Sequence, residues 1–208
     1  MFRNISILIL CFVWCARSFA GAEKNPQLTV FVYNYAGVPE RVLNQAERIT
    51  EKIYTSAQVG ISWKDCTRPL GEGGEQDKCS LSDPAVFSLR IVHRSLNLQE
   101  EDFGIAFLGS DGMGQQADVF YLGIERLKQS SSLGAPAILG HVMAHELGHL
   151  LLGSRSHSNL GIMQARWTSS QLRGISMGLL TFDRRQSEVI RARLLAPYAA
   201  LRNEEQRR

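Results

Sequence analysis

The sequence predicts one α/β domain with a mixed, mostly parallel, twisted sheet, a long buried helix and a C-terminal helix. Three observations lead to this fold class. Segments rich in β-branched and aromatic residues recur along the chain, an amphipathic helical pattern joins the first two of them, and an apolar helical pattern follows the last. The length of 208 residues and the 44% share of hydrophobic residues suit one compact domain.

The first three predicted elements form a βαβ unit. Residues 28–35 alternate in polarity and are predicted to form a strand. Residues 38–57 carry apolar side chains at helical spacing, with Pro39 near the start, where proline suits the first turn. Residues 60–64 form the second predicted strand. Strands joined by a helix run parallel, so we expect a parallel pair.

Three more extended segments follow. Residues 86–92 are predicted to form a strand, and residues 104–108 a short extended piece. Residues 117–122 are predicted to form another strand, because their continuous apolar run suggests burial on both faces. These segments extend the sheet begun by the βαβ unit.

Two helical patterns complete the predicted domain. The first opens at Pro136, runs to about Leu152 and meets Gly153, a residue typical of the position just after a helix. Its residues are apolar nearly all round, which predicts a buried helix. The second covers residues 182–195, and Pro197 is expected to end it.

The first twenty residues have the pattern of a cleaved export signal. Arg3 supplies a positive start, an apolar run covers residues 5–16, and Ser18 and Ala20 are small residues at the positions that a signal peptidase reads. The run is too short to cross a hydrocarbon core of ~30 Å. We therefore predict a secreted or periplasmic domain, residues 21–208, without stable membrane insertion. An uncleaved membrane anchor is the alternative.

Cleavage of this signal would leave two cysteines, Cys66 and Cys79, on either side of a polar, glycine-rich loop. An even pair in an exported protein predicts a disulfide, and two free thiols are the alternative. The formal net charge of +3 would fall to +1, because the signal contains Arg3 and Arg17 and no acidic residue. A charge this close to zero argues against nucleic acid as a partner.

The long apolar helix contains the motif H-E-x-x-H, formed by His145, Glu146 and His149. Side chains four residues apart lie on one face of a helix, so both imidazoles can converge on one metal ion. Zinc accepts imidazole nitrogen at about 2.0–2.1 Å. Glu146 lies about 100° away around the helix, where it can reach a water without binding the metal. The motif predicts a zinc site with a general base.

A catalytic zinc needs a third protein ligand and an open position for water. His157 is the best candidate, because a short turn after Gly153 could bring it back beneath the metal. Glu188 in the last predicted helix is an alternative third ligand. His141 lies one turn before His145, too far along the helix to share the ion, so we expect it to be packed; His93 is expected to be structural.

Residues 145–163 resemble the metzincin family of zinc metallopeptidases. That family has the pattern H-E-x-x-H-x-x-G-x-x-H and a methionine turn beneath the zinc. Met163 corresponds to the methionine of this turn, with a plain core position as the alternative, and the succession from His157 to Met163 is most similar to the matrixin branch. The spacing here is wider, because Gly153 lies four residues and His157 eight residues after His149.

The resemblance implies an exported, zinc-dependent endopeptidase that acts on proteins or peptides. Glu146 would activate a zinc-bound water, and a substrate could add as an extended strand to the edge segment 104–108. Two alternatives stay open: a zinc-binding module without catalysis, and a zinc hydrolase that acts on a substrate other than a peptide.

Overall fold

The computed structural model describes residues 25–67, 79, 81, 83, 85–94 and 103–205, with side chains as far as residue 196. The expected signal segment, residues 1–20, lies outside the described residues, as does most of the loop between the two cysteines. Within the described part of the chain, no helix is both long and apolar enough to cross a membrane.

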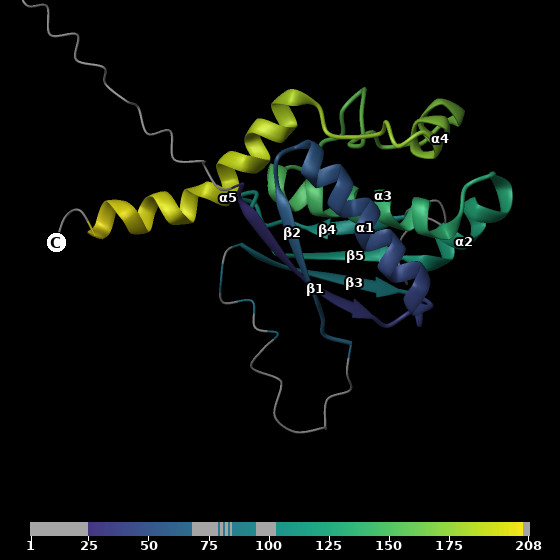
Figure 1. Ribbon diagram of the computed structural model, residues 1–208, viewed down its shortest axis with the longest axis horizontal. Helices are drawn as coiled ribbons and strands as arrows, with labels where there is room; N and C mark the ends of the chain where they lie inside the picture. The colour runs from purple at the N-terminus through teal and green to yellow at the C-terminus, as the bar shows by residue number, and fades with distance from the viewer. Residues whose placement is uncertain are drawn as a thin grey trace, which may run out of the picture.

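Five strands form one twisted sheet (Figure 1). They are β1 (Gln27–Asn34), β2 (Gly60–Asp65), β3 (Val86–Val92), β4 (Gly104–Phe107) and β5 (Gln116–Phe120). Their order is β2-β1-β3-β5-β4, and every neighbouring pair is parallel except β4 and β5, which are antiparallel. The predicted mixed, mostly parallel sheet is confirmed, and β4 is its outer strand on one side.

The helices are α1 (Glu40–Ser56), α2 (Tyr121–Ser130), α3 (Ala135–Leu152), α4 (Ser169–Ser176) and α5 (Arg184–Glu205). The central one is α3, which contacts the other four helices and strands β3, β4 and β5. Its residues are buried from Ile138 to Leu151, as its apolar sequence predicts. It ends at Gly153, whose φ of 64° is the left-handed conformation that glycine adopts at low cost.

A close contact between α1 and α3 holds the central helix in place. A Cβ atom at Gly140 would lie 2.6 Å from the Ala46 carbonyl oxygen, so only glycine lets the two backbones approach this closely. The Thr50 hydroxyl donates a hydrogen bond to the Gly140 carbonyl at 2.9 Å, and the Tyr54 hydroxyl donates to Ala144 at 3.2 Å. These buried bonds fix the position of α3 along α1.

Three sequence expectations need correction. The strand predicted over residues 117–122 ends at Phe120, because Tyr121 begins α2 and buries its side chain with that of Ile124 at helical spacing. The short helix α4 was not expected. The prediction that Pro197 ends the last helix is wrong, since α5 continues to Glu205 and changes direction along its length (Figure 1). A proline inside a helix removes one hydrogen bond and bends the helix, which need not end it.

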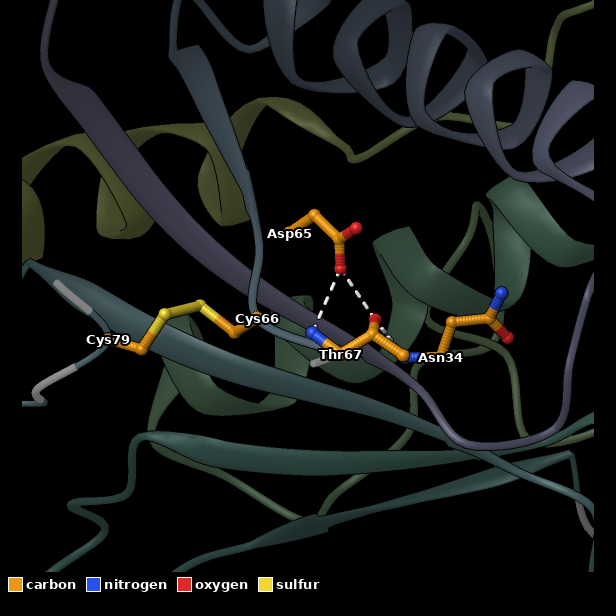
Figure 2. Close-up of a disulfide and its surroundings, with 5 residues drawn as sticks. All are labelled: Asn34, Asp65, Cys66, Thr67 and Cys79. Carbon is orange, nitrogen blue, oxygen red and sulfur yellow. Dashed lines mark hydrogen bonds between the residues drawn. A yellow bond between two sulfur atoms is a disulfide. The ribbon is translucent and has the colours of Figure 1, made fainter. Parts of the chain in front are cut away.

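The predicted disulfide is present, with 2.04 Å between the sulfur atoms of Cys66 and Cys79 (Figure 2). Cys66 directly follows β2, the outer strand on the side of the sheet opposite β4. Beside it, Thr67 donates from its backbone N–H to Asp65 at 2.9 Å, and its hydroxyl accepts from the Asn34 N–H at 2.9 Å. The bond from Asn34 holds the end of β2 against β1, and the disulfide ties the same end to Cys79.

Candidate metal centre

The predicted motif lies on α3, and its three side chains are buried. His145, Glu146 and His149 are 8%, 5% and 6% exposed. The Nε2 atoms of the two histidines lie 3.0 Å apart. Two nitrogens on one tetrahedral zinc would be roughly 3.3 Å apart if each bond is about 2.05 Å. The observed pair is therefore close to the spacing of two ligands of one ion.

Backbone carbonyls orient both imidazoles. The Nδ1 of His145 donates to the Ile162 carbonyl at 2.8 Å, and the Nδ1 of His149 donates to the Ser154 carbonyl at 2.7 Å. A carbonyl oxygen can only accept, so each Nδ1 carries the proton and each Nε2 keeps its lone pair. This is the tautomer that a metal ligand needs, fixed by a second hydrogen bond as in known zinc sites.

His157 lies on the loop after α3 and completes a three-histidine cluster. Its ring centroid is 5.4 Å from that of His145 and 4.9 Å from that of His149. One nitrogen from each of the three side chains falls within 4.8 Å of the others, a set that could hold a metal ion. The left-handed turn at Gly153 reverses the chain, and the Ser158 N–H donates to the Met163 carbonyl at 2.8 Å. The wide spacing of the motif thus still brings His157 to the other two.

The protonation of the cluster also suits a metal. Burial, together with the like charges of His149 and His157, lowers the pKa of His145 to about 4. Burial likewise lowers the pKa of His149 and of His157. Three neutral imidazoles in one place are a good donor set for zinc, because the metal displaces no protons at neutral pH.

Glu146 lies between α3 and the edge strand β4. A Cβ atom at Gly104 would be only 2.7 Å from the Cγ and Cδ atoms of Glu146. The glycine at the start of β4 therefore provides the space that the glutamate side chain occupies. Glu146 lines the same cavity as the three histidines, which has a volume of about 370 Å³. A carboxylate at this place can exchange a proton with a molecule bound in the cavity.

Met163 packs beneath α3 and is 1% exposed. A Cβ atom at Gly148 would lie 2.7 Å from the Met163 sulfur and 2.9 Å from the Phe182 ring. The residue before it, Ile162, accepts the Nδ1 proton of His145 through its carbonyl, and its N–H donates to the Thr181 carbonyl at 3.0 Å. Met163 is thus part of the segment that orients a histidine of the cluster.

Sequence reasoning missed the walls of the cavity. Trp167 stacks on Phe103 with 5.7 Å between ring centroids, and it lies nearly perpendicular to the His145 ring with 6.4 Å between centroids. Arg155 and Gln164 also line the cavity. These residues come from three separate segments, so no local spacing links them. An aromatic residue in the otherwise polar stretch after Met163 was the one available signal.

The other candidates lie outside the cluster. His141 is buried, donates from Nδ1 to the Ala137 carbonyl at 2.7 Å and meets the Trp167 ring edge-on, as expected of a packed histidine. Glu188, the alternative ligand, lies on the exposed side of α5 and pairs with Arg184 at 2.9 Å. His93 follows β3 on the surface and does not belong to the cluster.

No family model and no curated protein matches the chain. Among solved structures, a zinc-dependent peptidase from Methanocorpusculum labreanum matches with a TM-score of 0.50 and 13% identity over 77% of this chain and 99% of that one. Archaemetzincin from Methanopyrus kandleri matches with a TM-score of 0.49 and 19% identity, over 81% and 96%. Metalloproteinase-II from Bacteroides fragilis matches with a TM-score of 0.49 and 13% identity, over 84% of this chain and 55% of that one. At these identities the likeness concerns the fold alone. The mixed α/β fold of this chain is similar to that of a zinc-dependent peptidase.

Proposed function

We propose that this chain is an exported, metzincin-like, zinc-dependent endopeptidase, nearest in motif to the matrixin branch but with a wider turn before its third histidine. One observation carries the proposal. Three neutral imidazoles converge in a cavity that also contains a buried glutamate and borders an edge strand. A structural zinc site would have no use for a carboxylate that shares the cavity with the cluster.

His145, His149 and His157 would hold the metal, and their donor set fits zinc. Zinc, when bound, supplies a Lewis acid that polarises a carbonyl and lowers the pKa of a water toward ~7. The carbonyls of Ile162 and Ser154 keep the first two imidazoles in the correct tautomer throughout. Met163, as the methionine turn, would support the segment that carries Ile162.

Glu146 would act as the general base and acid of the reaction. Its carboxylate accepts a proton from the attacking water and returns it to the leaving amine. Burial between α3 and β4 keeps the carboxylate in position, with Gly104 leaving room for it. The remaining walls of the cavity, above all the stacked pair Trp167 and Phe103, exclude water and offer an apolar surface to a substrate side chain.

The substrate would be a protein or peptide in extended conformation. The sheet order ends at β4, so among the described strands one side of β4 has no partner. An internal segment of another chain can add there as a strand through backbone hydrogen bonds. The disulfide is compatible with an oxidising compartment outside the cytosol, and the sequence of residues 1–20 supports export.

Peptide cleavage tests the proposal directly. The zinc-loaded protein is incubated with a diverse peptide mixture, and mass spectrometry identifies new termini. We expect cleavage by the wild type and by Glu188→Gln, a control on the exposed side of α5. Glu146→Gln should bind zinc in equal stoichiometry and lose at least ~100-fold in rate, because the general base is gone.

Other outcomes would reject the proposal. Cleavage by Glu146→Gln at the wild-type rate would show that Glu146 is not the general base. Stoichiometric zinc without any cleavage would favour a zinc-binding module or a hydrolase of another substrate class.

A further inference from the structure

One cation lines the cavity beside the histidine cluster. Arg155 lies in the turn between His149 and His157, and its Nη2 donates to the Leu108 carbonyl at 2.5 Å. Within the described part of the chain, no carboxylate pairs with this guanidinium. The side chain is therefore anchored to the backbone, positively charged and without a carboxylate partner among the described residues.

The anchoring bond leaves most of the guanidinium available. Arginine has five N–H donors in a planar fork, and the Leu108 carbonyl accepts from one of them. At least one edge with two parallel donors therefore remains for a ligand. A carboxylate is the group whose geometry matches such an edge.

Arg155 and the aromatic wall lie at opposite ends of β4. Phe103, directly before the strand, stacks on Trp167, whereas Leu108, directly after it, binds Arg155. Five residues of extended chain separate the two backbone positions by roughly 16 Å. The Glu146 side chain lies against Gly104 at the first end of β4, and the three histidines line the cavity that Phe103 and Arg155 also line. An extended ligand along β4 would meet an aromatic surface on one side of the cluster and a cation on the other.

We propose that Arg155 is a specificity-determining residue that binds an acidic side chain of the substrate, within about three residues of the scissile bond and on the side away from Trp167. The inference rests on the proposed function, since it names the substrate class of that site. The hydrogen bond to Leu108 also holds the arginine at the end of β4, so little side-chain freedom is lost when the carboxylate binds.

Binding of zinc-directed ligands tests this without requiring turnover. The probes are short apolar peptide hydroxamates in two series, with the hydroxamate at the C-terminus or at the N-terminus. In each series, glutamate or glutamine occupies the first, second or third position from the hydroxamate. Calorimetry on the zinc-loaded protein gives the dissociation constant of every matched pair.

We expect one position in one series where glutamate binds roughly tenfold more tightly than glutamine, because the bond is charge-assisted. The ratio should fall toward one in Arg155→Gln and shrink at high salt. It should keep an intermediate value in Arg155→Lys, which retains the charge without the fork. Arg48→Gln, a control on the exposed surface of α1, should bind as the wild type does.

Three results would overturn the proposal: equal binding of glutamate and glutamine at all positions, a preference that survives in Arg155→Gln, or zinc-loaded protein that binds no hydroxamate. Zinc stoichiometry and the thermal midpoint show that each variant is folded. The cleavage assay reports on the proposed function separately. A glutamate preference without cleavage would keep the role of Arg155 and reject the peptidase.

Discussion

At the scale of single residues, two backbone carbonyls fix the tautomer and orientation of two histidines in the candidate metal centre. Ile162 and Ser154 accept the Nδ1 protons of His145 and His149. Because both acceptors belong to the main chain, no side-chain substitution at these positions deletes them. The orientation of the imidazoles depends instead on how the segments after α3 fold, and this couples the metal site to the conformation of the chain.

The buried histidines predict how the stability of the metal-free protein depends on pH. The pKa of His145 is lowered by burial to about 4, so the unfolded chain binds more protons than the folded one between that value and 6.5. The contribution is fully present above pH 6.5 and is lost as the pH falls toward 4. A pKa shift of this size corresponds to about 3 kcal/mol in the free energy of unfolding.

Glu47 has the opposite effect on how the stability of the protein depends on pH. Burial, followed by the charge of Glu51, raises the pKa of Glu47 to about 7, so its contribution is present at low pH and is lost as the pH rises through 7. Solvent screens this half-buried group, so its effect is the smaller one. We expect Glu47→Gln to lose more stability than the wild type between pH 6.5 and 4, as measured by urea unfolding. A variant less sensitive to acid than the wild type would contradict these assignments.

At the scale of elements, α3 depends on glycines where other parts of the chain approach it. Gly148→Ala would push a methyl group into the Met163 sulfur and the Phe182 ring. We expect a loss of about 1–3 kcal/mol in the free energy of unfolding from overpacking. Zinc affinity should fall as well, because Met163 follows the residue that holds His145. Both are measurable by denaturant titration and metal competition.

A matched glycine in another helix provides the control. A Cβ atom at Gly174 in α4 would be no closer than 3.7 Å to any neighbour. Gly174→Ala should therefore leave zinc affinity unchanged and stabilise the protein by up to ~1 kcal/mol through helix propensity. Equal losses in both variants would show that the packing around Met163 is not responsible.

Which elements could be predicted from the sequence depends on how local their signals are. The long helix α3 has apolar residues all round and a terminal glycine, and both signals lie within the segment itself. Two signals were present but not used. Thr168 and Gln171 form a capping box at the start of α4, and Tyr121 and Ile124 have helical spacing in α2. The continuous apolar run before α2 suits a strand or a helix equally well.

At the scale of the whole molecule, some residues of the candidate site could be predicted from the sequence and others could not. His145, Glu146 and His149 follow from one motif, and His157 from the need for a third ligand. Arg155 and Trp167 could not be assigned to the cavity, because their partners Leu108 and Phe103 precede them by more than forty residues. Contacts of this range depend on how the sheet edge lies on α3.

The disulfide and the metal centre lie at opposite edges of the sheet. Three strands separate β2, which leads into Cys66, from β4, which borders the cavity. At about 4.8 Å per step, the two outer strands are roughly 19 Å apart. Reduction should therefore lower the free energy of unfolding by about 3 kcal/mol through the loop it releases, and leave zinc stoichiometry and peptide cleavage at 25 °C unchanged. Thermal unfolding with and without reductant, beside a metal assay, measures this. Zinc loss well below the unfolding midpoint would contradict it.

The side of β4 that has no partner among the described strands has a consequence for the proteins on which such an enzyme would act. A segment can add to this edge only when it is already extended, whereas most segments of a folded protein are paired with their own neighbours. The free energy of local opening of the substrate then becomes part of the barrier to cleavage. Cleavage rates along a series of destabilised variants of one substrate protein should rise with the population of the opened segment. Which proteins are cleaved would then depend on how often their segments open locally as well as on their sequence.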